Sequence, residues 1–268
     1  MQEIPWYTHA CLLGRQGRAE EAVAALREGL AKGSWYNPEA LVNDPDLTVV
    51  RPELGSIVQE CEERRRHRHA ETRPQCLVLS PSSTLWDQQT LLLLHGRGDS
   101  ARRFAEHWRP LVDEGWTLVV PQSSQPWDSA SWCWDDGELA RREILTHLEE
   151  CRLKRGLDPA RIVAAGASQG ARLAVEIAHG AGIPWLCVIP AFPAGYDPAA
   201  LAAVPEHTRG VFLLGESDPW NVQTRPVAAA LQGAGASVEV QTMTGAGHEL
   251  PQDFAVYASA ALRKLELG

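Results

Sequence analysis

The chain has 268 residues, of which 44% are hydrophobic and 22% are charged. This size and composition are ordinary for one α/β domain with a smaller appendage, and they exclude a disordered, collagenous or coiled-coil chain. The 34 acidic residues outnumber the 25 basic ones and give a net charge of −9. We therefore expect no nucleic-acid partner, because the phosphate backbone would be repelled.

Membrane and secretion signals are missing from the sequence. No apolar run approaches the roughly 20 residues that a membrane span needs, and Met1–Pro5 carry no basic start or long apolar stretch typical of a secretory signal. The 6 cysteines are scattered without a CxxC pair, which is typical of reduced packing residues. We predict a cytoplasmic protein without an integral membrane segment.

Residues 1–72 are predicted to be helical. Apolar residues recur at intervals of three and four over 22–30, which places them in one stripe on a helix. Together with Trp6 and Ala10, this stripe resembles one tetratricopeptide unit. One unit and part of a second cannot bury the continuous core of a solenoid. We predict a helical appendage that either docks on the main domain or offers a groove to a protein partner. Two shorter helices are predicted to follow, at 38–42 and 52–66.

From residue 73 to 268, short apolar runs alternate with amphipathic segments, which predicts an α/β domain with a mostly parallel sheet and crossover helices. The run 91–94 is all leucine, as expected for a strand buried on both faces. The predicted strands are 76–79, 91–94, 117–120, 162–165, 185–189, 211–214 and 238–241. The predicted helices are 100–113, 138–155, 170–179, 226–231 and 252–267.

The pentapeptide Gly166–Gly170 has the pattern GxSxG. It lies between a predicted strand and a predicted helix, and a serine at such a tight turn is typical of a nucleophile elbow. The glycines allow the strand and the helix to approach closely, and the start of the helix offers N–H groups to a developing oxyanion. We predict that Ser168 is a nucleophile.

A serine hydroxyl needs a base and an orienting acid. His248 lies in a glycine-rich loop after the last predicted strand, and Asp218 follows the strand 211–214. Each of these residues sits at the carboxyl end of a predicted strand, where open α/β sheets place their sites. Glu216 is the rival acid, and Asp218 has an alternative role as a turn residue because Asp-Pro often begins turns.

Two further loops are expected at the same sheet edge. In His95–Gly98, glycines after a buried strand let backbone N–H groups face a reacting carbonyl, so we predict a structural role for His95 itself. In the second loop, Trp127, Trp132 and Trp134 are unusually dense, and binding sites are typically apolar. We predict that at least one of these indoles lines a substrate pocket; alternatively, all of them pin a long loop to the domain.

The segments LLLLHGRGDS, VVPQ, GASQGA, GESDPW and GAGH resemble the phospholipase/carboxylesterase branch of the α/β-hydrolases. That branch includes acyl-protein thioesterases and small bacterial carboxylesterases, and the similarity covers roughly residues 75–268. The resemblance implies the α/β-hydrolase fold, with Ser168, Asp218 and His248 as nucleophile, acid and base. The dienelactone-hydrolase-like and depolymerase-like branches share this skeleton and stay open as alternatives.

The resemblance also implies that the backbone N–H groups of Arg97 and Gln169 form the oxyanion hole. The sequence departs from the family pattern at two places. Gly170-Ala171 stands where Gly-Gly is typical, which alters helix–strand packing slightly. Trp220 stands where smaller groups are usual, so we expect it to border the substrate pocket.

Acyl transfer in two steps follows from these residues. His248 takes the proton of Ser168 as it attacks a carboxylic ester, a thioester or a lysophospholipid, and Asp218 orients the imidazole. No metal or organic cofactor is required, and His67 and His69 have no cysteine or third histidine beside them that would complete a metal site. The competing class is a non-catalytic adaptor that binds through its N-terminal helices, and the ordered triad argues against it.

Overall fold

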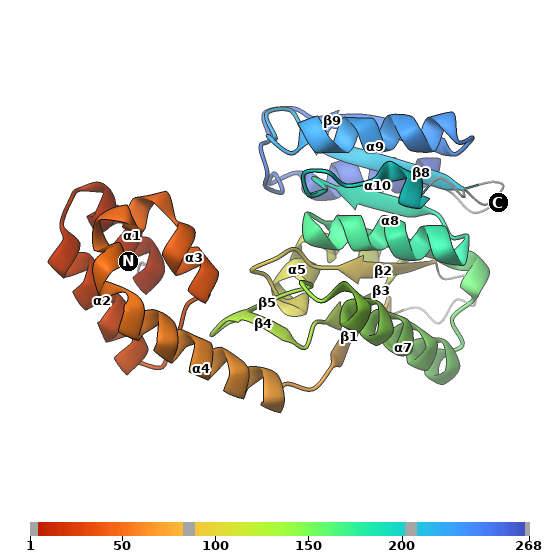
Figure 1. Ribbon diagram of the computed structural model, residues 1–268. Helices are drawn as coiled ribbons and strands as arrows, with labels where there is room; N and C mark the ends of the chain where they lie inside the picture. The colour runs from red at the N-terminus through yellow and green to blue at the C-terminus, as the bar shows by residue number, and fades with distance from the viewer. Residues whose placement is uncertain (1–4, 83–88, 202–207, 266–268) are drawn as a thin grey trace. The chain divides into compact units, whose positions relative to one another are not determined.

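The computed structural model describes residues 5–82, 89–201 and 208–265 (Figure 1). The chain divides into two compact units. The N-terminal unit consists of Met1–Arg73 and Ser124–Trp132, and the α/β unit consists of Pro74–Ser123 and Cys133–Gly268. The segment 124–132, which the sequence pattern assigned to the α/β domain, is therefore part of the N-terminal unit.

The N-terminal unit is helical, and its own hydrophobic core includes Leu26, Leu41 and Ile57, all almost completely buried. The first two helices approach closely at Gly29, where an added Cβ would lie only 2.9 Å from Cβ of Trp6. The elements are α1 (Trp6–Arg15), α2 (Ala19–Ala31), α3 (Pro38–Asn43), the 3₁₀ helix η1 (Pro45–Glu53) and α4 (Gly55–Glu71). The 3₁₀ helix η1 was not expected from the sequence.

A short hairpin completes this unit. Strands β4 (Gln125–Asp128) and β5 (Ser131–Cys133) pair with each other. Arg65 on α4 donates from Nε to the carbonyl of Pro126 over 3.2 Å, and Ser129 N donates to Trp35 O over 3.2 Å. The hairpin was predicted as a loop, since strands this short leave little periodicity in a sequence.

The α/β unit is built on a seven-stranded sheet with the order β1-β3-β2-β6-β7-β8-β9. Only the edge strand β1 runs antiparallel to its neighbour, β3, and the other described pairings are parallel. This confirms the α/β prediction and each predicted strand. The strands are β1 (Gln75–Leu79), β2 (Thr90–Leu94), β3 (Thr117–Gln122), β6 (Ile162–Ala167), β7 (Trp185–Val188), β8 (Arg209–Gly215) and β9 (Ser237–Met243).

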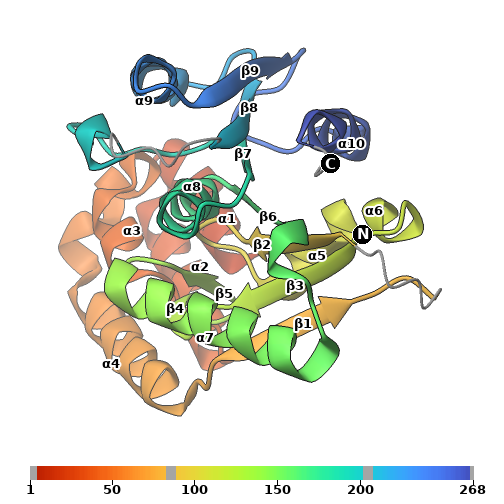
Figure 2. The same ribbon diagram turned by 90° about the vertical axis from the view of Figure 1, so that its right-hand side faces the viewer.

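Helices cover both faces of the sheet (Figure 2). Helices α5 (Ala101–Trp108), α6 (Pro110–Asp113) and α10 (Phe254–Lys264) pack on one face, and α7 (Gly137–Arg155), α8 (Gln169–Ala181) and α9 (Asn221–Gly233) pack on the other. Helix α9 begins at Asn221 rather than at the predicted Pro226, because the turn after Asp218 leads directly into it. The remaining short elements are the 3₁₀ helices η2 (Pro159–Arg161) and η3 (Pro198–Leu201).

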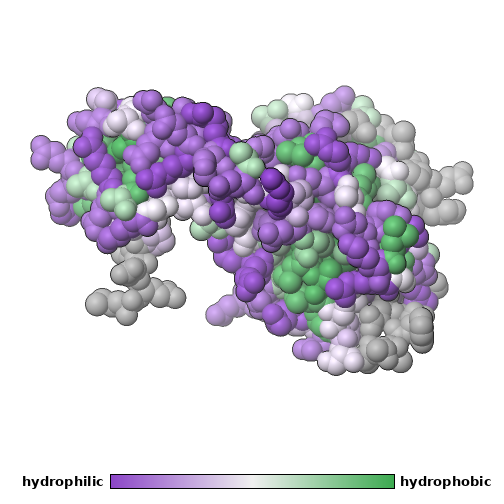
Figure 3. Space-filling view, turned by 90° about the horizontal axis from the view of Figure 1, so that it is seen from below, coloured by the Kyte–Doolittle hydropathy of each residue, from purple (hydrophilic) through white to green (hydrophobic). Residues whose placement is uncertain are grey.

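The surface of the α/β unit is mixed in polarity. Strand β1 lies along its lower edge in Figure 1, and four of its five residues are half-buried. Seen from below, that unit shows a hydrophobic patch bordered by hydrophilic residues (Figure 3).

Of the helices that the structure describes, none combines the length and the apolar character that crossing a membrane requires.

Candidate active site

Ser168 occupies the turn between β6 and α8 with a strained backbone. Its φ of 54° and ψ of −119° lie in a region that residues other than glycine rarely adopt. Strand β7 and the segment after it hold this conformation, because Ser168 N donates to Val188 O over 3.0 Å and Ala191 N donates to Ser168 O over 3.2 Å. The strained turn raises the hydroxyl above the carboxyl end of the sheet, as a nucleophile elbow requires.

The two glycines of the elbow are required by close packing. A Cβ on Gly166 would lie 2.5 Å from Gly170 O, and a Cβ on Gly170 would lie 2.1 Å from Leu94 O and 2.4 Å from His95 O. These neighbours are backbone atoms of α8, of β2 and of the loop after β2, so they cannot move aside as a flexible side chain could. Helix α8 can therefore begin this close to β2 only if both positions lack a side chain.

Replacing Gly170 with alanine is expected to destabilise the α/β unit by about 2–3 kcal/mol, because overpacking forces backbone shifts. Gly233→Ala serves as the matched control, since an added Cβ at this helical position meets no atom within 4 Å. Urea unfolding of both variants measures the difference. Equal stability of Gly170→Ala and the unsubstituted protein would contradict the packing argument.

Ser168, His248 and Asp218 are linked in series by hydrogen bonds. Ser168 Oγ lies 2.9 Å from His248 Nε2, and His248 Nδ1 lies 2.8 Å from Asp218 Oδ2. The side chain of Asp218 is only 1% exposed, whereas that of His248 is 29% exposed. The imidazole thus has one nitrogen toward the hydroxyl and the other toward a buried carboxylate, which is the geometry of a serine nucleophile with its base and orienting acid.

The neighbouring carboxylates hold the loop that carries the histidine. Glu216 Oε2 accepts from Gly245 N over 2.8 Å, and Glu249 Oε1 accepts from Gly247 N over 2.7 Å. The structure therefore engages the rival acid Glu216 in a loop contact, and it is Asp218 that contacts His248.

The loop after β2 reaches the serine. An added Cβ on Gly96 would lie 3.5 Å from Ser168 Cβ. Gln169 is the first residue of α8, so its N–H group has no partner within the helix. Arg97 and Gln169 both line the cavity at Ser168, where their backbone N–H groups are the predicted oxyanion donors.

His95 is buried beneath this loop. Its Nδ1 lies 2.8 Å from Gly96 O, which can only accept, and its Nε2 accepts from Ser123 N over 3.4 Å. Burial lowers the pKa of His95 to about 4, so the ring is neutral at pH 7. The ring connects the loop after β2 to the end of β3, in agreement with the predicted structural role.

Asp135 joins the two residues that carry the predicted oxyanion donors. Its Oδ1 accepts from Arg97 Nη2 over 2.5 Å and from Gln169 Nε2 over 2.9 Å, and Gln169 Oε1 in turn accepts from Trp134 N over 2.9 Å. Burial would raise the pKa of Asp135, but the hydrogen bond from Gln169 and the charge of Arg97 hold it below its ordinary value. The sequence analysis did not single out Asp135, since no local pattern marks this role.

The predicted substrate-binding tryptophans lie in different surroundings. Trp220 lines the Ser168 cavity, with its ring centroid 6.2 Å from that of His248. Trp134 is fully buried against His95 and donates from Nε1 to His95 O over 2.8 Å. Trp127 and Trp132 belong to the hairpin of the N-terminal unit.

The cavity at Ser168 has a volume of about 330 Å³. Its lining includes residues that the sequence analysis did not select, among them an arginine on α8. The lining residues are Arg97, Ser168, Gln169, Arg172, Ala191, Pro193, Trp220 and His248.

Comparisons with known proteins concern the fold of the chain. Residues 5–70 match the family model described as the A/B hydrolase-like N-terminal domain. The crystal structure of an uncharacterised protein from Bacillus cereus ATCC 10987 is similar over 97% of this chain and 86% of its own, with 22% identity and a TM-score of 0.62. A comparison with curated proteins gives no match.

Two solved structures resemble a smaller part of the chain. A carboxylesterase from Bacillus cereus is 17% identical over 75% of this chain and 99% of its own, with a TM-score of 0.58. A phospholipase/carboxylesterase from Dyadobacter fermentans DSM 18053 is 17% identical over 72% and 97%, with a TM-score of 0.54. The chain shares the fold of these structures, a mostly parallel sheet with helices on both faces, which confirms the predicted α/β-hydrolase fold. The N-terminal helices are similar to the A/B hydrolase-like N-terminal domain, and their tetratricopeptide resemblance stays a prediction.

Proposed function

We propose that this protein is a serine hydrolase that cleaves carboxylic esters through an acyl-enzyme intermediate. The hydrogen-bonded series from Ser168 Oγ through His248 to Asp218, with the serine on a strained elbow, carries this proposal. The similarity to structures named carboxylesterase and phospholipase/carboxylesterase supports it. Thioesters and lysophospholipids also contain an acyl carbonyl that a serine can attack, so the proposal includes them as candidate natural substrates.

Each residue has a role in the proposed reaction. His248 takes the proton of Ser168 as Oγ attacks the carbonyl carbon, then returns it to the departing alkoxide oxygen. Asp218 keeps the Nδ1 proton in place and stabilises the imidazolium. The N–H groups of Arg97 and Gln169 bind the oxyanion, at the positive end of the α8 dipole. Water activated by the same histidine then releases the acid and restores Ser168.

The cavity volume of about 330 Å³ favours a compact substrate, because it lies near the lower end of the range for small-molecule sites. The experiment that tests the proposal is hydrolysis of p-nitrophenyl esters of increasing acyl length by the full chain. Activity that declines beyond short acyl groups is expected, and inhibition by a serine-directed fluorophosphonate should accompany it. Absence of both activity and labelling at Ser168 would contradict the proposal.

Trp220 is expected to contribute an apolar wall to the acyl site. Trp220→Ala should lower kcat/KM for the octanoate ester relative to the acetate ester by about tenfold, since each methylene contact is worth about 1–3 kcal/mol. The ratio of the two kcat/KM values is the measurement. The same ratio, measured for Trp127→Ala, Trp132→Ala and Trp134→Ala, shows whether those indoles also contact the acyl group. A Trp220→Ala ratio within about threefold of the unsubstituted protein would rule out the acyl wall.

A further inference from the structure

Arg172 lies one helical turn beyond the candidate nucleophile. Its backbone N–H group donates to Ser168 O over 3.3 Å, and Arg172 lines both the cavity that contains Ser168, His248 and Trp220 and the adjacent cavity between α7 and α8. The side chain is only 21% exposed. The Arg172 guanidinium serves neither the proposed proton transfers nor the proposed oxyanion hole, although Arg172 lines the cavity of the candidate nucleophile.

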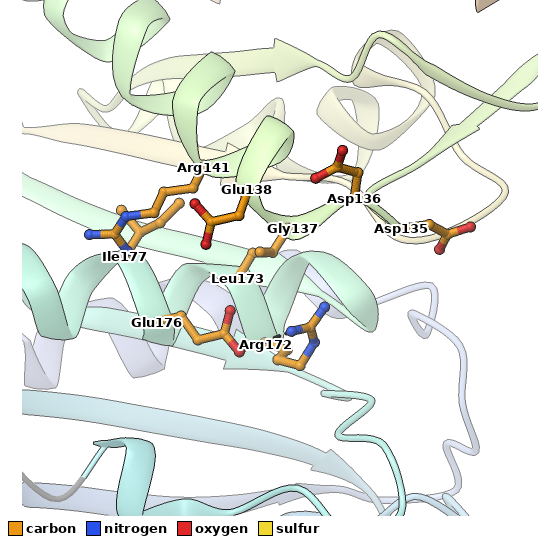
Figure 4. A pocket seen from close by; sticks show the side chains of 9 residues that line it. All are labelled: Asp135, Asp136, Gly137, Glu138, Arg141, Arg172, Leu173, Glu176 and Ile177. Atoms are coloured by element: carbon orange, nitrogen blue, oxygen red, sulfur yellow. Dashed lines mark hydrogen bonds and ion pairs between the residues drawn. The ribbon is translucent and has the colours of Figure 1, made fainter.

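One edge of this guanidinium has no protein partner among the described residues. Nη1 donates to Glu176 Oε1 over 3.0 Å, and Glu176 Oε1 also accepts from Tyr196 Oη over 3.2 Å. Nε and Nη2 of Arg172 have no acceptor in the part of the chain that the structure describes. In Figure 4 the guanidinium lies between Glu176 and the N-terminal end of α8, the end that carries Ser168.

Other arginines of this protein, among them Arg109 and Arg152, bind carboxylates through the Nε and Nη2 edge. Arg109 contacts Glu106 through Nε and Nη2 at 2.8 and 2.9 Å, and Arg152 contacts Glu149 in the same way at 2.7 Å each. Such two-point contacts match the planar carboxylate and are stronger than single neutral hydrogen bonds. Arg172 therefore presents a carboxylate-binding edge that Glu176 leaves open.

The charges around Ser168 favour an anion. The cavity lining contains Arg97 and Arg172 but no acidic residue, although the chain as a whole has a net charge of −9. The adjacent cavity between α7 and α8, about 530 Å³ in volume, is more acidic, because four of its nine lining residues are acidic and two, Arg141 and Arg172, are basic. Those four are Asp135, Asp136, Glu138 and Glu176 (Figure 4).

We propose that the ester cleaved at Ser168 carries a carboxylate group, which Arg172 binds through Nε and Nη2. This inference rests on the proposed esterase function and narrows its substrate class to half-esters of dicarboxylic acids and similar anionic esters. The partial burial of Arg172 strengthens the contact, because a charge pair is screened less away from bulk water. Arg172 is then a specificity-determining residue, and it takes no part in proton transfer.

The test compares two p-nitrophenyl esters of equal length, the pentanoate and the glutarate monoester, in which a carboxylate replaces the terminal methyl group. Ser168→Ala supplies the background rate. This control is needed because the free carboxylate of the glutarate monoester can attack the ester carbonyl of the same molecule without the enzyme. The measured quantity is the ratio of kcat/KM for the glutarate ester to that for the pentanoate. We expect this ratio to exceed about ten in the unsubstituted protein and to fall as ionic strength rises.

Arg172→Gln should reduce that ratio at least about tenfold, and Arg172→Lys should give an intermediate value because a lysine keeps the charge without the planar two-point edge. Arg141→Gln is the matched control, since Arg141 lines the α7–α8 cavity and not the cavity at Ser168. Its ratio should equal that of the unsubstituted protein.

The outcomes separate the two proposals. If the pentanoate is hydrolysed in a Ser168-dependent way but the ratio is near one, or if Arg172→Gln leaves it unchanged, carboxylate recognition is overturned and the esterase function stands. If neither ester is hydrolysed above the Ser168→Ala background, the esterase function fails and the inference fails with it.

Discussion

Substitution of Ser168 by alanine is expected to lower kcat for ester hydrolysis by at least ~10³-fold, because it removes the proposed nucleophile. The fold should be retained, since the backbone hydrogen bonds of the elbow do not involve the hydroxyl. Steady-state assays on the acetate ester give the rate, and circular dichroism with thermal unfolding verifies the structure.

Ser237→Ala is the matched control for this substitution, because Ser237 is exposed at the start of β9. It should hydrolyse the acetate ester at the rate of the unsubstituted protein. A Ser168→Ala variant that retained about a tenth of that rate would exclude Ser168 as the nucleophile.

Asp218→Asn is expected to lower kcat by roughly 10⁴-fold, by analogy with other serine triads. Asp218 Oδ1 accepts from Trp220 N over 2.9 Å while Oδ2 faces His248 Nδ1. An asparagine that keeps its oxygen toward Trp220 N turns its NH₂ group toward Nδ1. The imidazole must then carry its proton on Nε2, where it cannot accept the proton of Ser168.

Glu216→Gln provides the comparison, and its kcat should remain within about tenfold of the unsubstituted value. The carboxylate of Glu216 accepts from Gly245 N, a contact that a glutamine oxygen can also make. Measurement of kcat for both variants on the same ester separates the two acids. A large loss in Glu216→Gln together with a small loss in Asp218→Asn would transfer the orienting role to Glu216.

The sheet and the elbow could be predicted from the sequence because local physics encodes them. Buried parallel strands must be apolar throughout, as Leu91–Leu94 are, and crossover helices must have one apolar stripe. The glycines around Ser168 are required by the approach of β6, α8 and β2. Since parallel strands end at one edge of a sheet, the positions of Ser168, Asp218 and His248 after their strands already predicted that they meet.

Contacts between distant segments were decided only by the tertiary structure. Segment 124–132 joins the N-terminal unit through Trp35 and Arg65, and nothing within the hairpin's own sequence specifies those partners. The pair Arg172–Glu176 is a local i,i+4 contact within α8, but only the tertiary structure brings Tyr196 to Glu176 and places Arg172 on the lining of the Ser168 cavity. The spacing of apolar residues along the sequence indicates which face of a helix or strand is buried. It does not report which polar groups of other elements lie opposite, because that depends on the register and spacing that the whole fold imposes.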